Sequence, residues 1–578
     1  GVQVGVFDGD VEHHIDFGDR VHIQESEMPV SSNNGHGIHV TGTMAGAGVL
    51  DPLARGVAPK ATMYTYNFSV MSNRLSVAEK MLQAVQHFNI NITQNSYGVA
   101  VGKYCKYYDK FSYNGMEPSW ETDYITNLHP TLLHVYSVGN DRKQEDNCGH
   151  PYGSSTKRSK NALYVGALNA DESMSEYSSW GPMDDGRLLP TAVALGTNVY
   201  STRQRNSYDL GTGSSMACPS VSGAAILLIE RYRQLNDMTL PLEALLRGAI
   251  ANTAKDMGAT GPDYQYGYGL IDASKAVQTL EQRWYVTNTL RAGAPSATHT
   301  IKVPSNVAAL KVMLVWTDTV SSKQYRYGEA ALINDLDLAV THGGATTKPW
   351  VLNPSKPGAP AVRGEDHVNN MEQVTIDNPT AGDYEVKITP RTISSREQQY
   401  VVVYWFEADA PTIIYPLGGE QLAPGDRFYI RWTGLSSPVT AEISYDNGAS
   451  YSTIATDIAE DKVEYEIPHN APATAVARIR LTATNGITIK NNIPFSIMGV
   501  PQNVRANAIE CGGAWAIQWN AVEGAQAYEI LKADVGEGTY EVIGTATATD
   551  FTIPEDKKSQ DMRNVYSVRA KSQSGATG

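Results

Sequence analysis

The first 280 residues alternate short apolar runs with helical patterns, and this alternation constrains the fold more than any other feature. Five segments have the length and apolar character of buried strands: 2–7, 61–68, 90–98, 132–140 and 162–168. Residues 76–88 lie between two of these segments and repeat their apolar side chains with helical spacing. This pattern predicts an α/β domain with a mostly parallel sheet and helices on both faces, whose ligand crevice lies at the carboxyl ends of the strands.

Beyond residue 280 the long helical patterns disappear. Alternating strands with Gly, Pro and Asn turns continue to the end of the sequence and predict β-sandwich or jelly-roll modules. Pro and Gly residues near 409–419 and 499–501 divide this part into three. We therefore predict four domains: an α/β domain over 1–280 and all-β domains over 281–408, 409–498 and 499–578.

The composition excludes some classes of partner. The 578 residues carry a formal net charge of −15, which argues against nucleic acid or an anionic membrane surface, because both need basic patches. No run of 18 apolar residues predicts a transmembrane segment. Of the four cysteines, Cys105 and Cys148 lie in neighbouring polar loops, and they either pair in an oxidising compartment or remain free thiols. The sequence enters a strand at once, so we expect that a targeting segment was removed.

Three fragments of the first domain each place a reactive side chain at the edge of an element. Asp8 ends a strand, His36 precedes a helix in "NNGHGIHVTGTMAG", and Ser215 precedes a helix in "GTGSSMACPSVSG". That helix is predicted to begin near Met216, with Pro219 in its first turn. A serine hydroxyl is a nucleophile only beside a base, and the base needs an orienting partner. We predict Ser215 as nucleophile, His36 as general base and then acid, and Asp8 as the orienting carboxylate.

Acyl transfer also needs a hydrogen-bond donor for the oxyanion. Asn140 follows the buried segment "HVYSVG", so its amide can project into the predicted crevice. Asn95 is a weaker alternative. Backbone N–H groups at the start of the helix after Ser215 also favour developing negative charge.

Each fragment alone has an ordinary structural explanation. An aspartate at the end of a strand is usually a turn residue, and a serine before a helix is usually an N-cap. His36 and His39 have the spacing of a metal pair, but no carboxylate or third ligand accompanies them, which favours a structural role for His39. The catalytic interpretation therefore depends on all four fragments occurring in one domain in the chain order Asp, His, Ser.

At these residues the sequence resembles the subtilisin-like serine proteases. The family's H-G-T-H-V-A-G is "HGIHVTG" here, its G-T-S-M-A-T-P-H-V-[AS]-G is "GSSMACPSVSG", its A-G-N is "VGN" and its S-x-G is "SYG". "YSSWGPMDDGRLLP", "LINDLDLAV" and "VNNMEQVTI" resemble a bacterial branch with a jelly-roll domain after the catalytic one. The resemblance covers roughly 1–408. It departs at Gly9, where the family has Thr or Ser, and at the bulky Tyr136.

The resemblance implies a secreted serine endopeptidase that hydrolyses peptide bonds in proteins or peptides through an acyl-enzyme. It assigns seven residues to the substrate pocket: Ser96, Tyr97 and Gly98 in one wall, Ser137, Val138 and Gly139 in the other, and Gly166 at the base. No cofactor is required for the chemistry. Structural calcium is common in the family, and Asp335 and Asp337 in "NDLDL" are candidate ligands, although aspartates in strand-edge turns need no metal.

The last two modules contain no catalytic set. Residues 499–578 resemble a fibronectin type III domain with Trp519 and Tyr528 in its core, and 409–498 are predicted as an Ig-like sandwich around Trp432. They could bind a surface, a protein or a glycan, or act as spacers, which we favour. The long all-β part leaves one alternative open, a catalytically silent binding or adhesion protein on a subtilisin-like scaffold. An α/β-hydrolase is excluded by the chain order of the triad.

Overall fold

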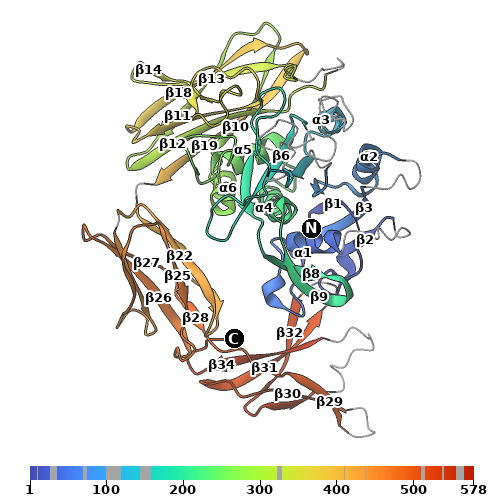
Figure 1. Ribbon diagram of the computed structural model, residues 1–578, viewed down its shortest axis with the longest axis vertical. Helices are drawn as coiled ribbons and strands as arrows, with labels where there is room; N and C mark the ends of the chain where they lie inside the picture. Colours follow the sequence, from blue (N-terminus) through green and yellow to red (C-terminus); the bar gives the residue numbers. More distant parts are fainter. Residues whose placement is uncertain are drawn as a thin grey trace. The chain divides into compact units, whose positions relative to one another are not determined.

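The computed structural model describes residues 1–9, 11–25, 35–68, 75–98, 119–142, 158–321, 328–408, 410–436, 438–509, 514–534, 536, 539–554 and 565–578. The chain divides into two compact units (Figure 1). The first is Gly1–Glu407 together with Gly536–Gly538, and the second is formed by Ala408–Val535 and Thr539–Gly578. The predicted pairing of Cys105 with Cys148 lies outside the described residues. Among the described helices, none has the length and apolar character needed to cross a membrane.

A seven-stranded parallel sheet forms the centre of the first half of the first unit. Its strand order is β2-β3-β1-β4-β5-β6-β7, and every neighbouring pair is parallel. The strands are β1 (Gln3–Asp8), β2 (Val21–Ile23), β3 (Thr62–Asn67), β4 (Ile92–Asn95), β5 (Leu133–Ser137), β6 (Ala162–Leu168) and β7 (Ala192–Leu195). The predicted parallel sheet is confirmed, and β8 (Val199–Arg203) and β9 (Ser207–Gly211) add an antiparallel hairpin.

Helices cover both faces of this sheet, as the alternation of elements predicts. The helices are α1 (His36–Ala45), α2 (Val77–Phe88), α3 (Ser119–Leu128), α4 (Ser214–Leu235), α5 (Glu243–Asn252) and α6 (Ala273–Glu281). Val4 and Val6 of β1 share a core with α1 and α4, whereas Phe7 on the opposite face packs with α2 and α3. Because the strands are parallel, Asp8 and the residues that follow β4 and β5 meet at one edge of the sheet.

Two packed antiparallel sheets complete the first unit. Their orders are β10-β19-β12-β17 and β11-β18-β13-β14, and β15 pairs with β16. The strands are β10 (Tyr285–Arg291), β11 (Ala297–Val303), β12 (Val307–Trp316), β13 (Asp335–His342), β14 (Ala345–Thr347), β15 (Trp350–Val351), β16 (Val362–Arg363), β17 (Met371–Asp377), β18 (Gly382–Thr392) and β19 (Glu397–Ala408). On β12, Val312 and Leu314 face the core between the sheets, whereas Met313 and Val315 pack into the core of the α/β part. The strand is therefore buried on both faces.

The second unit is all-β in its described residues. The strands between residues 412 and 497 are β20 (Thr412–Tyr415), β21 (Gln421–Leu422), β22 (Arg427–Thr433), β23 (Val439–Ser444), β24 (Ser452–Ile458), β25 (Lys462–Glu466), β26 (Thr474–Ala483), β27 (Thr488–Lys490) and β28 (Phe495–Ile497). The later strands are β29 (Arg505–Ile509), β30 (Ala514–Gln518), β31 (Ala525–Asp534), β32 (Thr539–Ala546), β33 (Asp550–Thr552) and β34 (Tyr566–Ser572). Trp432 lies in the core of the earlier group, and Trp519 and Tyr528 lie in the core of the later one. The domain classes and the four domain boundaries remain predictions.

Candidate active site

The side chains of Asp8 and His36 are hydrogen-bonded to each other at the carboxyl edge of the parallel sheet. The Nδ1 atom of His36 lies 2.7 Å from Oδ1 of Asp8. The carboxylate is buried, whereas 27% of the His36 side chain is exposed. When Nδ1 of a neutral imidazole donates to the carboxylate, Nε2 carries the lone pair and is free to act as a base. The sequence prediction of a carboxylate that orients this histidine therefore fits the geometry.

Two local features hold this pair in place. The Gly9 N–H donates to Oδ1 of Asp8 at 2.7 Å, which fixes the carboxylate at the end of β1. Gly37, the second residue of α1, approaches the same backbone closely. A Cβ atom at Gly37 would lie 1.8 Å from the carbonyl oxygen of Gly9. Only glycine lets α1 begin this close to the strand, and the close approach brings His36 to Asp8.

Ser215 is the second residue of α4, whereas the sequence predicts that it precedes the helix. The helix begins at Ser214 and not near Met216, so Pro219 is inside it and not in its first turn. A proline there has no N–H to donate to the carbonyl oxygen four residues earlier, which belongs to Ser215. The Ser96 hydroxyl donates to that oxygen instead, at 3.0 Å. Ser215 in turn donates from Oγ to the Ser96 carbonyl oxygen at 3.2 Å.

Asn140 lies beside the start of α4. Its Oδ1 atom accepts a hydrogen bond from the Ser214 N–H at 2.8 Å, and the Ser214 hydroxyl accepts one from the Gly139 N–H at 3.2 Å. Asn140 is exposed, so its amide faces solvent next to Ser215. With Oδ1 engaged by the helix, Nδ2 is oriented as a donor. The alternative, Asn95, is buried, and its Nδ2 already donates to Thr93 and to the Val135 carbonyl.

The residues expected to line the substrate pocket differ in exposure. Ser96, Ser137 and Val138 are buried, Tyr97 and Gly139 are partly buried, and Gly98 is exposed. A Cβ atom at Gly98 would meet no atom of the described residues within 4 Å. Gly166 is buried, and a Cβ atom there would lie 3.1 Å from Val193 and 3.2 Å from Pro190. Ser96 contacts Ser215 and Gly139 contacts Ser214, so one residue of each predicted wall lies at the start of α4.

His39 lies three residues after His36 on α1 and has a structural environment. It is fully buried, and its Nε2 atom lies 3.0 Å from the carbonyl oxygen of Val199. Burial, followed by the charge of Arg203, lowers the pKa of His39 to about 4. The imidazole is therefore neutral at ordinary pH, and the interpretation of His39 as a structural residue fits its surroundings.

The parallel sheet and the contact of His36 with Asp8 at its edge are consistent with the sequence comparison. The sequence model of the subtilase family matches residues 1–269, somewhat less than half of the chain. This match supports a serine protease in that part of the chain. It does not extend to the β modules after residue 269.

Individual relatives match the same part of the chain. Subtilisin Savinase from Lederbergia lenta is 29% identical over 286 residues, which are 48% of this chain and 91% of that protein. An alkaline protease from Alkalihalobacillus alcalophilus is also 29% identical over 286 residues, covering 48% of this chain and 64% of that protein. Among solved structures, the self-cleaved protease domain of PatA is 19% identical and covers 49% of this chain and 97% of that domain, with a TM-score of 0.37.

Sequence reasoning missed two sets of residues that the fold brings together. Gln94 is a buried polar residue of β4, and its amide contacts Ser96 and two side chains of α4. His367 faces Asp335 and Asp337 across 30 residues of sequence. An amide among apolar neighbours in "INITQNSYG" was a signal for the first set. No local spacing signals the second, because its members lie on a strand and on a separate loop.

Proposed function

We propose that the chain is a serine endopeptidase that hydrolyses peptide bonds through the triad Asp8, His36 and Ser215. The observation that carries this proposal is the 2.7 Å contact of His36 Nδ1 with the buried Asp8 carboxylate. It lies at the sheet edge where β1, β4 and β5 end. A histidine held in this tautomer is the group that an otherwise unreactive serine needs.

The chemistry follows from the roles of these groups. Ser215 Oγ attacks the substrate carbonyl carbon while His36 Nε2 takes its proton. The negative charge that develops on the carbonyl oxygen is stabilised by Asn140 Nδ2 and by backbone N–H groups at the start of α4. The imidazolium, stabilised by Asp8, then protonates the leaving amine and leaves an acyl-enzyme. A water molecule activated by His36 releases the second product.

The substrates proposed are proteins and peptides bound in an extended conformation. Ser96, Tyr97 and Gly98 would line one wall of the specificity pocket, and Ser137, Val138 and Gly139 the other. The surroundings of Gly98 support this, because a Cβ atom there would meet no atom of the described residues within 4 Å and a backbone strand could approach it. We propose an extracellular location from the family resemblance. We also propose that the β modules after residue 408 act as spacers.

One observation favours a second candidate, a catalytically silent binding protein on the same scaffold. The Ser215 hydroxyl donates its hydrogen bond to the Ser96 carbonyl oxygen. This bond must be released before His36 can accept the proton. If it were retained with substrate bound, Ser215 would not react.

Hydrolysis of internally quenched peptides with blocked ends tests the proposal, because exopeptidases do not cleave them. We expect the intact chain to cleave such peptides and Ser215→Ala and His36→Ala to be inactive. Asn140→Ala should lower kcat by about 100- to 1,000-fold, the known cost of removing such a donor in a subtilisin. Ser220→Ala is a matched control on the same helix and should be fully active. A folded intact chain without cleavage of a diverse library would support the silent binding protein.

A further inference from the structure

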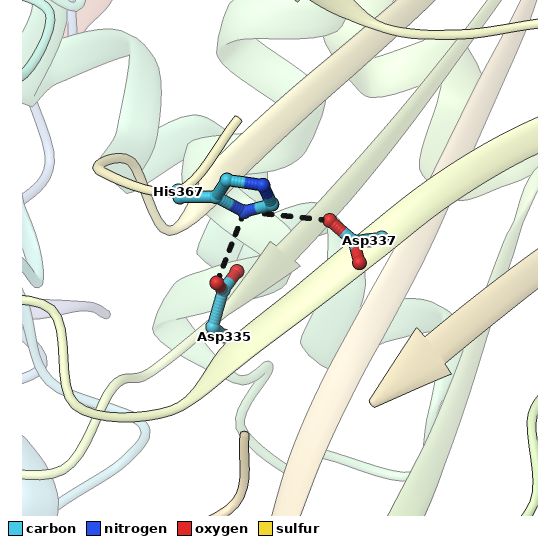
Figure 2. Close-up of side chains that lie close together, drawn as sticks. All are labelled: Asp335, Asp337 and His367. Atoms are coloured by element: carbon cyan, nitrogen blue, oxygen red, sulfur yellow. Dashed lines mark ion pairs between the residues drawn. The ribbon is translucent and has the colours of Figure 1, made fainter. Parts of the chain in front are cut away.

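Two aspartates and a histidine converge on one side of the β module in the first unit. Asp335 and Asp337 are alternate residues at the start of β13, so their side chains lie on the same face of the strand. His367 lies in the loop between β16 and β17 and turns its ring toward both carboxylates (Figure 2). One ligand atom from each residue can be chosen so that all three lie within 4.8 Å of one another.

The spacing of these atoms suits a small metal ion. His367 Nδ1 lies 3.0 Å from Oδ2 of Asp335 and 3.6 Å from Oδ1 of Asp337. Ligand atoms about 2.0–2.1 Å from a tetrahedral zinc ion are separated by about 3.3 Å from one another. The two measured separations lie on either side of this value. Three protein ligands at such an ion leave one position for water.

Hydrogen bonds do not explain why the side chains of Asp335, Asp337 and His367 lie so close together. Nδ1 of His367 and Oδ1 of both aspartates are buried atoms without a hydrogen-bond partner in the described part of the chain. Asp335 is only 9% exposed, so water does not compensate its Oδ1 atom freely. Buried polar atoms without partners are costly, and a metal ion is one of the few ligands that satisfies three of them together.

A further buried carboxylate lies near the cluster. Glu372 is 1% exposed, and its Oε1 atom has no hydrogen-bond partner in the described part of the chain. Its Oε2 atom accepts from the N–H of Leu338, the residue after Asp337, at 2.7 Å. A group of carboxylates that includes buried, unpartnered oxygen atoms is a favourable environment for a cation.

Nearby cations are already shared among carboxylates. Arg391 lies 3.6 Å from Asp335 and 3.8 Å from Glu365, and half of its side chain is exposed. Lys348 pairs with Glu365 at 2.8 Å. These exposed pairs contribute little, because solvent screens them. Oδ1 of Asp335 and Oδ1 of Asp337 have no hydrogen-bond partner among the described residues, so these two atoms can bind a cation.

We propose that Asp335, Asp337 and His367 bind a divalent transition metal ion, with zinc preferred. An imidazole nitrogen selects for metals of this class, whereas calcium takes six to eight oxygen ligands at longer distances. This proposal replaces the expectation of calcium at Asp335 and Asp337, which the sequence alone suggested. It is independent of the proposed protease activity.

The bound ion would brace the loop that carries His367. Two residues of that loop reach the α/β part of the same unit. Asn369 Oδ1 accepts from the Leu188 N–H at 2.8 Å, and Asn370 Nδ2 donates to Asn161 Oδ1 at 3.0 Å. A metal that fixes this loop to β13 would therefore stabilise the contact between the β module and the α/β part.

Metal titration of the intact chain tests the proposal, with Ser215→Ala as the background to prevent self-digestion. We expect one zinc ion to bind per chain by calorimetry and to raise Tm. Cobalt(II) in place of zinc should give visible absorption of a four-coordinate site. His367→Ala should weaken zinc binding by at least about 100-fold, because losing even an outer-shell partner of a metal ligand costs about 10- to 100-fold.

Two controls make the outcome decisive. His469→Ala removes a histidine that is 83% exposed and far along the sequence, and it should leave zinc binding unchanged. Asp337→Asn keeps the shape of the site while removing a charge, and it should weaken binding as His367→Ala does. The proposal is overturned if zinc binds no tighter than to the His367→Ala chain. It is also overturned if calcium binds more tightly than zinc.

Discussion

His36 and His39 lie three residues apart on α1, and their side chains differ in exposure and in the groups that they contact. His36 is partly exposed and contacts a buried carboxylate, so it can hold a proton during a reaction. His39 is enclosed, and its ring nitrogens contact neutral groups that include the Val199 carbonyl and the Thr43 hydroxyl. The residue type is the same, and the surroundings distinguish the proposed catalytic role of His36 from the structural environment of His39.

The lowered pKa of His39 predicts a loss of stability in acid. Its pKa is about 4 in the folded chain and about 6.5 when unfolded, so the unfolded chain binds more protons between these values. Stability is therefore unaffected above about pH 6.5 and falls as the pH is lowered toward 4. Between pH 7 and pH 5 this residue should cost about 2 kcal/mol.

Urea unfolding of the Ser215→Ala chain at pH 7 and pH 5 measures this effect. In a His39→Gln variant, which keeps a donor for the Val199 carbonyl, the acid-induced loss should be smaller by that amount. An equal loss in both chains would show that His39 does not titrate as its burial requires.

Strand β4 and helix α4 are joined by a continuous set of buried hydrogen bonds. The Gln94 Oε1 atom accepts from the Ser222 hydroxyl at 2.5 Å and from the Cys218 thiol at 3.2 Å. Gln94 Nε2 donates to the Ser96 hydroxyl at 2.7 Å, and that hydroxyl donates to the Ser215 carbonyl oxygen. These contacts hold the first turns of α4, and with them the proposed nucleophile, against the sheet edge.

Replacing Gln94 by leucine should impair catalysis more than substrate binding. Leucine has a similar volume but leaves the hydroxyls of Ser96 and Ser222 without their partner, which costs about 1–3 kcal/mol of stability for each buried group. We expect kcat to fall while KM changes little, because the start of α4 is displaced. Steady-state kinetics on a blocked peptide measure both. The exposed Gln278→Leu on α6 is the control, and a Gln94→Leu chain with unchanged kcat would contradict this role.

The periodic elements were predictable from local sequence, and the contacts between them were not. Apolar runs and helical spacing gave β1, β3, β4, β5, β6 and α2 to within a few residues. The start of α4 was misplaced because Pro219 signals a first turn, whereas the Ser96 hydroxyl makes a proline tolerable inside the helix. Gln94 and Ser222 lie 128 residues apart, so only the folded chain shows that they pair.

The members of the proposed triad could be picked out from the sequence because each lies in a motif. Asp8, His36 and Ser215 stand in short stretches whose small residues and position at the edge of an element are visible in the sequence. Only part of the cluster of Asp335, Asp337 and His367 could be identified from the sequence. Two aspartates on one face of a strand were evident, but the loop that supplies the histidine approaches them only through tertiary packing.

Within the first unit, the α/β part and the first β module share one hydrophobic core. Val315 and Val403 of the module lie in the same core as the helices of the α/β part, and a Cβ atom at Gly248 of α5 would lie within about 3 Å of both. Lys160 and Asp318 form a fully buried ion pair at 2.5 Å between the two parts. The boundary at residue 280 therefore separates sequence patterns, and not independent cores.

Truncation tests this shared core. A chain ending at residue 283 would expose the apolar surface of α5 and leave Lys160 buried without its partner, which is strongly destabilising. We expect it to be insoluble or to lack a cooperative thermal transition. A chain ending at residue 408 retains the whole unit and should unfold cooperatively and keep the peptidase activity of the intact chain. An active, cooperatively folded 1–283 chain would contradict the shared core.

The most direct test of the central claim is covalent labelling by a fluorophosphonate probe, which reacts only with an activated serine. We predict that the intact chain is labelled, that mass spectrometry places the label on Ser215, and that Ser215→Ala abolishes it. Ser220→Ala should be labelled as the intact chain is. A folded intact chain that is not labelled, or a label on another residue, would contradict the assignment of Ser215 as the nucleophile.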